Sequence, residues 1–235
     1  MQNHSRPSPN FNDRPAGESV DAVILHYTGM QTAQAALDRL TAREAGVSAH
    51  YLLDTDGTLY TLVSEDKRAW HAGVSYWRGA DNLNHTSIGI EIVNPGHEFG
   101  YQAFPNAQIE SLLHLLAGIT ARWQIDPRCI VGHSDIAPTR KIDPGEFFPW
   151  HTLAQAGFGL WPEGLKGREG QSHVAASHAP LPALSNPTPA GLTAYYSRQQ
   201  PAPLTEAAPL SVAAARSGLK PIGSHPQAVD DDVAL

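Results

Sequence analysis

The sequence contains a single cysteine, Cys129, among its 235 residues. One cysteine excludes an internal disulfide, and it also excludes a structural metal site closed by several thiolates. Because Cys129 opens the apolar run 129–131, we interpret it as a packed core thiol rather than a nucleophile. The chemistry of this protein therefore has to come from other residue types.

The sequence is also poor in positive charge and in long apolar runs. Its 16 Lys and Arg residues face 23 Asp and Glu residues, and the net charge of −7 argues against binding to a nucleic-acid backbone. No run of about 18 apolar residues is present, and residues 1–7 lack the apolar core of a signal peptide. We therefore expect a cytoplasmic monomer without nucleic-acid or membrane partners, or a periplasmic protein if the start has been trimmed.

The character of the chain changes near residue 162. Before it, apolar segments alternate with turn signals at the spacing of an α/β domain, whereas after it Ala, Pro, Ser and Gly dominate without periodicity. We predict one folded domain over residues 1–162, with its core at about 18–160 and a central mixed β-sheet flanked by helices. Residues 163–235 are predicted to be a mostly disordered, Pro/Ala-rich tail.

Within the domain, apolar runs of strand length and helical stripes can be assigned. Thr32 and Asn106 are expected to begin helices, with Asn106 as a cap and an apolar stripe following it. Residues 77–84 have the polar composition of a surface loop, and residues 68–73 are too short to assign. Strands are expected at residues 20–27, 48–53, 58–63, 87–93 and 129–132, the second and third forming a hairpin.

The strand at residues 87–93 has two different faces. Its three isoleucines, at every second position, share one face. Glu91 therefore lies on the opposite face with Gly89 and Val93, so it has small neighbours. A carboxylate in such surroundings is a candidate for acid/base chemistry.

Much of the chemistry is concentrated in residues 133–145. This segment holds an imidazole, His133, an ammonium, Lys141, and two carboxylates, Asp135 and Asp143, within eleven residues. Its two prolines and its final glycine argue against a regular helix or strand. A rigid polar loop of this kind has the ingredients of a metal or acid/base site, provided that other segments supply the missing partners.

His26, near the end of a predicted strand, is one such partner. Two imidazoles and one carboxylate, with one position left for water, are typical of a catalytic zinc site, and His26, His133 and Asp143 fit that pattern. The alternative is that these residues only pack at a strand end, cap a loop and start a turn, and spacing alone does not decide between the two interpretations. A purely structural zinc would need a fourth ligand such as His50 or His71.

Five segments carry a resemblance to a known family when they are taken together in chain order. They are LHYTG at 25–29, SAHY at 48–51, AWHAG at 69–73, NHTSIGIE at 84–91 and GHSDIAPTRKIDPG at 132–145. In these segments the chain resembles the zinc N-acetylmuramoyl-L-alanine amidases, the amidase-2 class that shares its fold with peptidoglycan recognition proteins. The match is best with bacterial enzymes that trim anhydromuropeptides and peptidoglycan fragments, and it runs from about residue 10 to residue 162.

The resemblance implies a zinc hydrolase that cleaves the amide between the lactyl group of N-acetylmuramic acid and L-alanine, in cell-wall turnover or recycling. It implies that His26, His133 and Asp143 are the zinc ligands. It places the family's catalytic glutamate on Glu91 and its second catalytic residue on Lys141. The implied partner is a muropeptide or a peptidoglycan fragment.

The resemblance also implies that Trp70, His71 and Asn84 line a substrate groove. Close relatives often carry an arginine where this chain has Asn82, which leaves the stem-peptide preference open. A non-catalytic peptidoglycan-binding protein of the same fold is the alternative function. That alternative is expected where a ligand or the glutamate is missing, and this sequence retains all of them.

Overall fold

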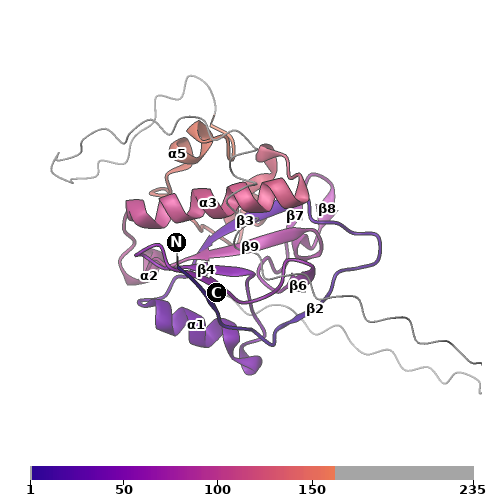
Figure 1. The fold of residues 1–235 in the computed structure, drawn as a ribbon, viewed down its shortest axis with the longest axis horizontal. Helices are drawn as coiled ribbons and strands as arrows, with labels where there is room; N and C mark the ends of the chain where they lie inside the picture. Colours follow the sequence, from indigo (N-terminus) through magenta and orange to yellow (C-terminus); the bar gives the residue numbers. More distant parts are fainter. Residues whose placement is uncertain (1, 162–235) are drawn as a thin grey trace, which may run out of the picture.

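A six-stranded mixed β-sheet forms the centre of the computed structural model, which describes residues 2–161 (Figure 1). Four neighbouring strands, β4, β9, β3 and β10, run parallel, β5 is antiparallel to β4, and β1 pairs with β5 in parallel. In spatial order the strands are β1 (Asn3–Ser5), β5 (Leu59–Thr61), β4 (Tyr51–Leu53), β9 (Ser87–Ile92), β3 (Ala22–Tyr27) and β10 (Ile130–Gly132). The predicted fold class and the predicted hairpin are thereby confirmed.

Helices cover both faces of the sheet, with α3 (Asn106–Trp123) on one side and α1 (Ala33–Thr41) on the other (Figure 1). The isoleucines of β9 pack in one hydrophobic cluster with the apolar stripe of α3. Val93, which follows β9, packs in a second cluster with Leu37 of α1. Burying each such side chain contributes about 1.5–3 kcal/mol. The predicted alternation along β9 therefore places Glu91 on the α1 side of the sheet.

The two long helices begin differently. The Thr32 side chain accepts a hydrogen bond from the main-chain N–H of Ala35 at 3.1 Å, as an N-cap does. The prediction that Asn106 caps α3 is wrong. Pro105 occupies the cap position with extended backbone angles, and Asn106 is already the first helical residue.

Several short elements were not expected. The predicted loop at 77–84 contains a tight hairpin and a 3₁₀ turn, and the segment from residue 133, expected to be irregular, begins with one helical turn. Two short strands, β2 and β6, pair outside the main sheet. The unexpected elements are β2 (Phe11–Asp13), β6 (Lys67–Ala69), β7 (Tyr76–Trp77), β8 (Ala80–Asp81), η2 (Leu83–His85), α4 (His133–Ile136), η1 (Arg43–Ala45), α2 (Gly96–Phe99) and η3 (Pro127–Cys129). The helical turn that the sequence predicts at 150–156 is present as α5 (Trp150–Gln155).

A half-buried arginine, Arg14, ties the N-terminal segment to the centre of the fold. The Arg14 guanidinium donates to the main-chain oxygens of Asn84, His85 and Ser87 and of Glu65, at 2.8 to 3.3 Å. Burial lowers its pKa to about 10, but it stays charged at neutral pH. Arg14 thereby fixes the entry to β9, the strand that carries Glu91.

Within residues 2–161, no helix combines the length and the apolar character that a bilayer crossing requires. The cytoplasmic location stays a prediction. The predicted tail, residues 163–235, lies outside the described residues. Its disorder therefore stays a prediction.

Deletion of residues 163–235 is expected to leave the melting temperature unchanged. The reason is that the hydrophobic clusters on both faces of the sheet are built from side chains within residues 2–161. Thermal unfolding of the full chain and of residues 1–162, measured side by side, checks this. A fall of several degrees in the shorter chain would show that the tail packs on the domain.

Candidate active site

Three adjacent parallel strands end at one edge of the sheet, and each brings a polar side chain there. His26 on β3 is the register partner of Glu91 on β9. His133 follows directly after β10, whose last residue, Gly132, pairs with Leu25. Carboxyl ends of parallel strands are rigid and open onto loops, which is where α/β folds place their sites.

Asp143 joins the two histidines to form a compact triangle. His26 Nδ1 and His133 Nδ1 lie 2.9 Å apart, and each lies 3.1 Å from Asp143 Oδ2. All three side chains are buried, with 1%, 3% and 7% of their residue surfaces exposed. Together they form a group whose ligand atoms can hold one metal ion. The structure thus brings together the residues that the sequence predicted as ligands.

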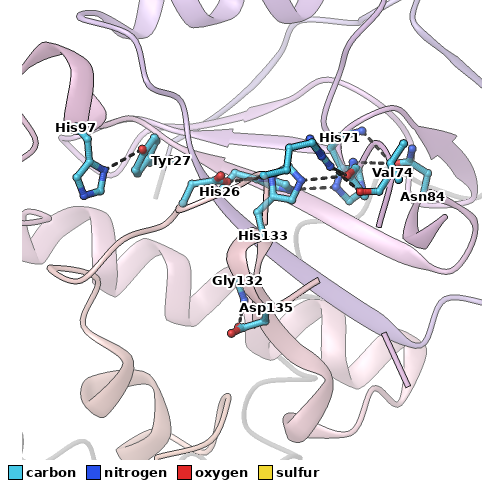
Figure 2. A network of polar contacts seen from close by, with 12 residues as sticks. His26, Tyr27, His71, Val74, Asn84, His97, Gly132, His133 and Asp135 are labelled. Atoms are coloured by element: carbon cyan, nitrogen blue, oxygen red, sulfur yellow. Dashed lines mark hydrogen bonds and ion pairs between the residues drawn. The ribbon is translucent and has the colours of Figure 1, made fainter. Parts of the chain in front are cut away.

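The segment after β10 folds back on itself to return Asp143 to His133. The Asp135 carboxylate accepts the main-chain N–H of Gly132 at 2.7 Å, which caps the single turn of α4 (Figure 2). The main-chain N–H of Ser134 donates to the carbonyl of Asp143 at 2.9 Å. Asp143 is followed by a cis peptide bond to Pro144. Asp135 therefore shapes the loop and is not part of the ligand triangle.

The chemistry of this donor set fits a divalent cation. His133 Nε2 lies 3.0 Å from the carbonyl oxygen of Ala72. A carbonyl only accepts, so Nε2 carries the proton and Nδ1 turns its lone pair toward the triangle. Burial opposes ionisation of Asp143, but hydrogen bonds and positive charge from the imidazoles, when these carry a proton toward it, hold the pKa of this carboxyl group well below its usual range. A metal ion in the triangle would take the place of that proton. Two acceptors facing each other at 3.1 Å repel each other, and a cation between them would remove that repulsion. Neutral imidazole together with carboxylate is a ligand set that suits zinc.

Glu91 lines the same cavity as the triangle, and one of its carboxyl oxygens has no hydrogen-bond partner among the described residues. Only 1% of the residue is exposed, and the unpartnered atom, Oε2, is buried. Burial is the main cause that raises the pKa of Glu91 well above its usual range, the charge of Asp143 adds to it, and Lys141 opposes it. A carboxyl group whose pKa is raised in this way holds a proton more readily than an exposed glutamate does, which suits a group that accepts a proton and returns it.

A cavity of about 160 Å³ joins these groups to the surface. Lys141 contributes its ammonium to the wall, and burial lowers the pKa of that ammonium. Ile142, which is 58% exposed, and the half-buried Tyr27 also line it. The lining consists of His26, Tyr27, His71, Glu91, His133, Arg140, Lys141, Ile142 and Asp143.

Comparison with known proteins agrees with this geometry. A family model described as N-acetylmuramoyl-L-alanine amidase matches residues 16–146, which is more than half of the chain and contains the whole triangle, Glu91 and Lys141. The chain belongs to the N-acetylmuramoyl-L-alanine amidase family. The resemblance stated from the five segments is confirmed.

Two curated amidases of this family are similar over the same region. The N-acetylmuramoyl-L-alanine amidase AmiD of Escherichia coli (strain K12) is 43% identical over 156 residues, which cover 61% of this chain and 55% of AmiD. The 1,6-anhydro-N-acetylmuramyl-L-alanine amidase AmpD of Haemophilus influenzae is 34% identical over 161 residues, covering 61% of this chain and 85% of AmpD. The chain thus spans little more than half the length of AmiD.

Solved structures of the family share the fold. The complex of Escherichia coli AmiD with the substrate anhydro-N-acetylmuramic acid-L-Ala-D-gamma-Glu-L-Lys has a TM-score of 0.57 and 41% identity, covering 65% of this chain and 63% of that one. The crystal structure of AmpDh3 from Pseudomonas aeruginosa has a TM-score of 0.58 at 41% identity, covering 63% of each chain. Both place the central sheet described above within the amidase fold.

The three residues predicted to line a substrate groove occupy different places. Trp70 is partly exposed and its indole N–H donates to Asn12 Oδ1 at 3.1 Å. Asn84 has no exposed surface, and its Oδ1 accepts the main-chain N–H groups of His71 and Ala72 at 2.9 and 2.8 Å. A fully buried side chain has no route to a substrate, so we assign Asn84 to holding the main chain of the AWHAG segment. Substrate contact by Trp70 stays a prediction.

His71 and His50, named above as fourth ligands of a structural zinc, do not face the triangle. His71 Nδ1 lies 3.1 Å from His26 Nε2, behind the ring of that ligand (Figure 2). His50 Nδ1 accepts the main-chain N–H of Gly89 at 2.9 Å. Among the described residues the amidase site therefore has three ligand groups and an open side toward the cavity, as a catalytic metal site requires.

Some wall residues of the amidase cavity were not predicted. Tyr27, Arg140 and Ile142 each neighbour a predicted site residue in the sequence, and this adjacency was the only signal available. The Arg140 guanidinium donates to the carbonyls of Ala72 and Val74 at 2.9 and 2.8 Å. These bonds tie the loop of Lys141 to the AWHAG segment, a pairing that no local pattern reveals.

Proposed function

We propose that this chain is a zinc-dependent N-acetylmuramoyl-L-alanine amidase that cleaves the bond between the lactyl group of N-acetylmuramic acid and L-alanine in muropeptides or peptidoglycan fragments. The observation that carries the proposal is the buried triangle of His26, His133 and Asp143 beside Glu91, whose Oε2 atom is buried without a hydrogen-bond partner. The names of AmiD and AmpD, and the substrate named in the AmiD complex, support the substrate class.

The three ligands would hold zinc at the inner end of the cavity. Zinc there supplies Lewis acidity toward the amide carbonyl and lowers the pKa of water to about 7. Glu91 takes a proton from the attacking water as the new C–O bond forms. Glu91 then gives that proton to the nitrogen of L-alanine as the C–N bond breaks, so that an amine leaves and a carboxylic acid remains.

Lys141 acts on the oxygen of the carbonyl group. Its ammonium lies in the same cavity wall as the ligands and two residues before Asp143. Negative charge develops on the carbonyl oxygen only as water attacks, so a cation fixed beside that position stabilises the transition state more than the substrate. This gives Lys141 the role of an oxyanion partner.

The alternative of a non-catalytic peptidoglycan-binding protein has less support. Such a protein needs no proton carrier. It therefore has no reason to bury an ionisable group at a cost in stability. Here Glu91 is buried without a partner, which is unfavourable for stability and is explained by a role in the reaction. We also propose residues 1–162 as the catalytic domain, acting as a monomer.

Product analysis by mass spectrometry tests this function. Full-length protein is incubated with a soluble anhydromuropeptide and, in parallel, with intact sacculi, each with and without a zinc chelator. We expect free stem peptide from the soluble substrate, its loss with the chelator, and its return when zinc is added. If zinc-loaded protein releases no stem peptide from either substrate, the amidase proposal is wrong and the binding protein becomes the better interpretation.

A further inference from the structure

A line of hydrogen bonds leads from the back of His26 into the protein interior, and Figure 2 shows its first two residues, His26 and His71. His26 Nε2 lies 3.1 Å from His71 Nδ1, and His71 Nε2 lies 3.3 Å from Ser87 Oγ. Ser87 Oγ in turn lies 2.5 Å from the carbonyl oxygen of Leu83. At most 5% of His26, His71 and Ser87 is exposed, so water does not interrupt the line.

The far end of this line fixes the direction of every proton in it. The carbonyl of Leu83 only accepts, so the Ser87 hydroxyl must donate to it. With its proton used, Ser87 Oγ accepts from His71 Nε2. His71 is buried, which favours the neutral ring, and a neutral ring whose proton is on Nε2 has an acceptor at Nδ1, which receives the N–H of His26 Nε2.

The tautomer of His26 decides what the ligand triangle can bind. With the proton on Nε2, His26 Nδ1 presents a lone pair to the triangle, as His133 Nδ1 does. With the proton on Nδ1, His26 would donate to Asp143 Oδ2 or His133 Nδ1, which lie 3.1 and 2.9 Å away. The proton would then form a hydrogen bond within the triangle, and His26 Nδ1 would have no lone pair to offer a metal ion.

Two further contacts hold the ring of His71 in place. Gly89 on β9 lies directly beneath it, and a Cβ atom at that position would come within 2.3 Å of the His71 ring. The main-chain N–H of His71 is fixed by Asn84 Oδ1 at 2.9 Å. The absent side chain at residue 89 and the buried amide at residue 84 therefore both serve to place this imidazole behind His26.

We propose that His71 and Ser87 are positioning residues that hold His26 in its Nε2-protonated tautomer and so keep the metal site open to a cation. The proposal rests on the proposed function for the identity of the metal. Outer contacts of this kind commonly change metal affinity by about 10–100-fold. Neither residue touches the substrate in this role.

Nitrogen-15 NMR of the histidine side chains tests the tautomers directly, in the full-length protein freed of metal. We expect His26, His71 and His133 each to show a protonated Nε2 and a lone pair on Nδ1. In Ser87→Ala the population of His26 protonated on Nδ1 should rise. A wild-type protein in which His26 carries its proton on Nδ1 would overturn the proposal without any variant.

Zinc affinity, measured by competition with a chromophoric chelator, tests the consequence. His71→Phe, which fills the space but accepts nothing, should raise the zinc dissociation constant by about 10–100-fold. His71→Asn, whose Oδ1 can take the place of Nδ1 as acceptor, should recover most of that loss. An unchanged dissociation constant in His71→Phe, or equal losses in both variants, would overturn the proposal.

Ser8→Ala is the matched control for Ser87→Ala. Ser8 is also buried and its hydroxyl also donates to a main-chain carbonyl, that of Leu40, at 2.5 Å. We expect Ser87→Ala to weaken zinc binding and Ser8→Ala to leave it unchanged; equal effects would point to a general loss of stability and overturn the proposal. Because turnover is not measured, a protein that binds zinc in this way but cleaves no muropeptide would refute only the proposed function.

Discussion

Glu91→Gln is expected to keep stoichiometric zinc and to lose about 10²–10⁴-fold in the rate of muropeptide cleavage. Glutamine has nearly the same volume, so the packing of β9 is preserved, but its carboxamide neither takes a proton from water nor gives one to the leaving amine. Glu91 Oε2 is buried without a partner and lies outside the ligand triangle. The substitution therefore separates proton transfer from metal binding, and kcat together with zinc content by elemental analysis measures both.

The same substitution has a second expected effect, on stability in the absence of metal. Burial raises the pKa of Glu91 in the folded protein above its value in the unfolded chain. Ionising Glu91 therefore costs stability as the pH rises through the folded-state pKa, whereas at lower pH the neutral acid is favoured. Metal-free Glu91→Gln should be more stable than metal-free wild type at high pH, and the difference should shrink in acid. Denaturant unfolding at several pH values measures this.

Glu65→Gln is the matched control. Glu65 is also largely buried, but its carboxylate accepts hydrogen bonds from Tyr51, Arg122 and Trp123 at 2.6 to 3.0 Å. Loss of its charge should reduce stability and leave kcat per folded molecule unchanged. Near-normal turnover in Glu91→Gln would exclude Glu91 as the proton carrier, and loss of zinc in that variant would show that it serves the metal instead.

The central sheet was predictable from the sequence because most of its strands are recognisable from the local pattern of apolar residues and turn residues. The strands at 20–27 and 87–93 are apolar runs bounded by turn signals, and alternation along the second assigned Glu91 to its face. The strands β2 and β6 were missed because they are short and polar and pair across more than fifty residues. Arg78, with φ of 51°, and Gly79, with φ of 91°, form the unexpected turn between β7 and β8, a conformation that an arginine rarely adopts.

In the site, too, some features could be predicted from the sequence and others could not. The residues of the ligand triangle were predicted because the resemblance named them, and their positions after adjacent parallel strands explain why they meet. The roles of Asn84 and His71 were not predictable, since both depend on which way a side chain turns in the folded protein. Asn84 turns inward to the main chain of His71, and His71 Nε2 turns toward Ser87. Sequence spacing fixes which residues are near each other, but proton positions come only from the packed structure.

His133→Ala is expected to lose both zinc and detectable amidase activity. The substitution removes one corner of the ligand triangle, leaving His26 and Asp143, and two protein ligands are too few for a catalytic zinc site. It also leaves the carbonyl of Ala72 without the hydrogen bond from His133 Nε2, though Arg140 still donates to that oxygen. Because the carbonyl keeps one partner, we expect the domain to remain folded. Elemental analysis for zinc and product analysis by mass spectrometry measure the two losses.

The stability of the same variant gives an independent measure of metal binding. A ligand that binds only the folded state raises the melting temperature with its concentration, by about 2.7 kcal/mol of stability at one hundred times its dissociation constant. Zinc should therefore raise the melting temperature of wild type and leave that of His133→Ala unchanged. His114→Ala, which removes an exposed imidazole on α3, is the control and should respond as wild type does. Stoichiometric zinc in His133→Ala, or an undiminished zinc response, would show that His133 is not a ligand, since the remaining two groups cannot account for either.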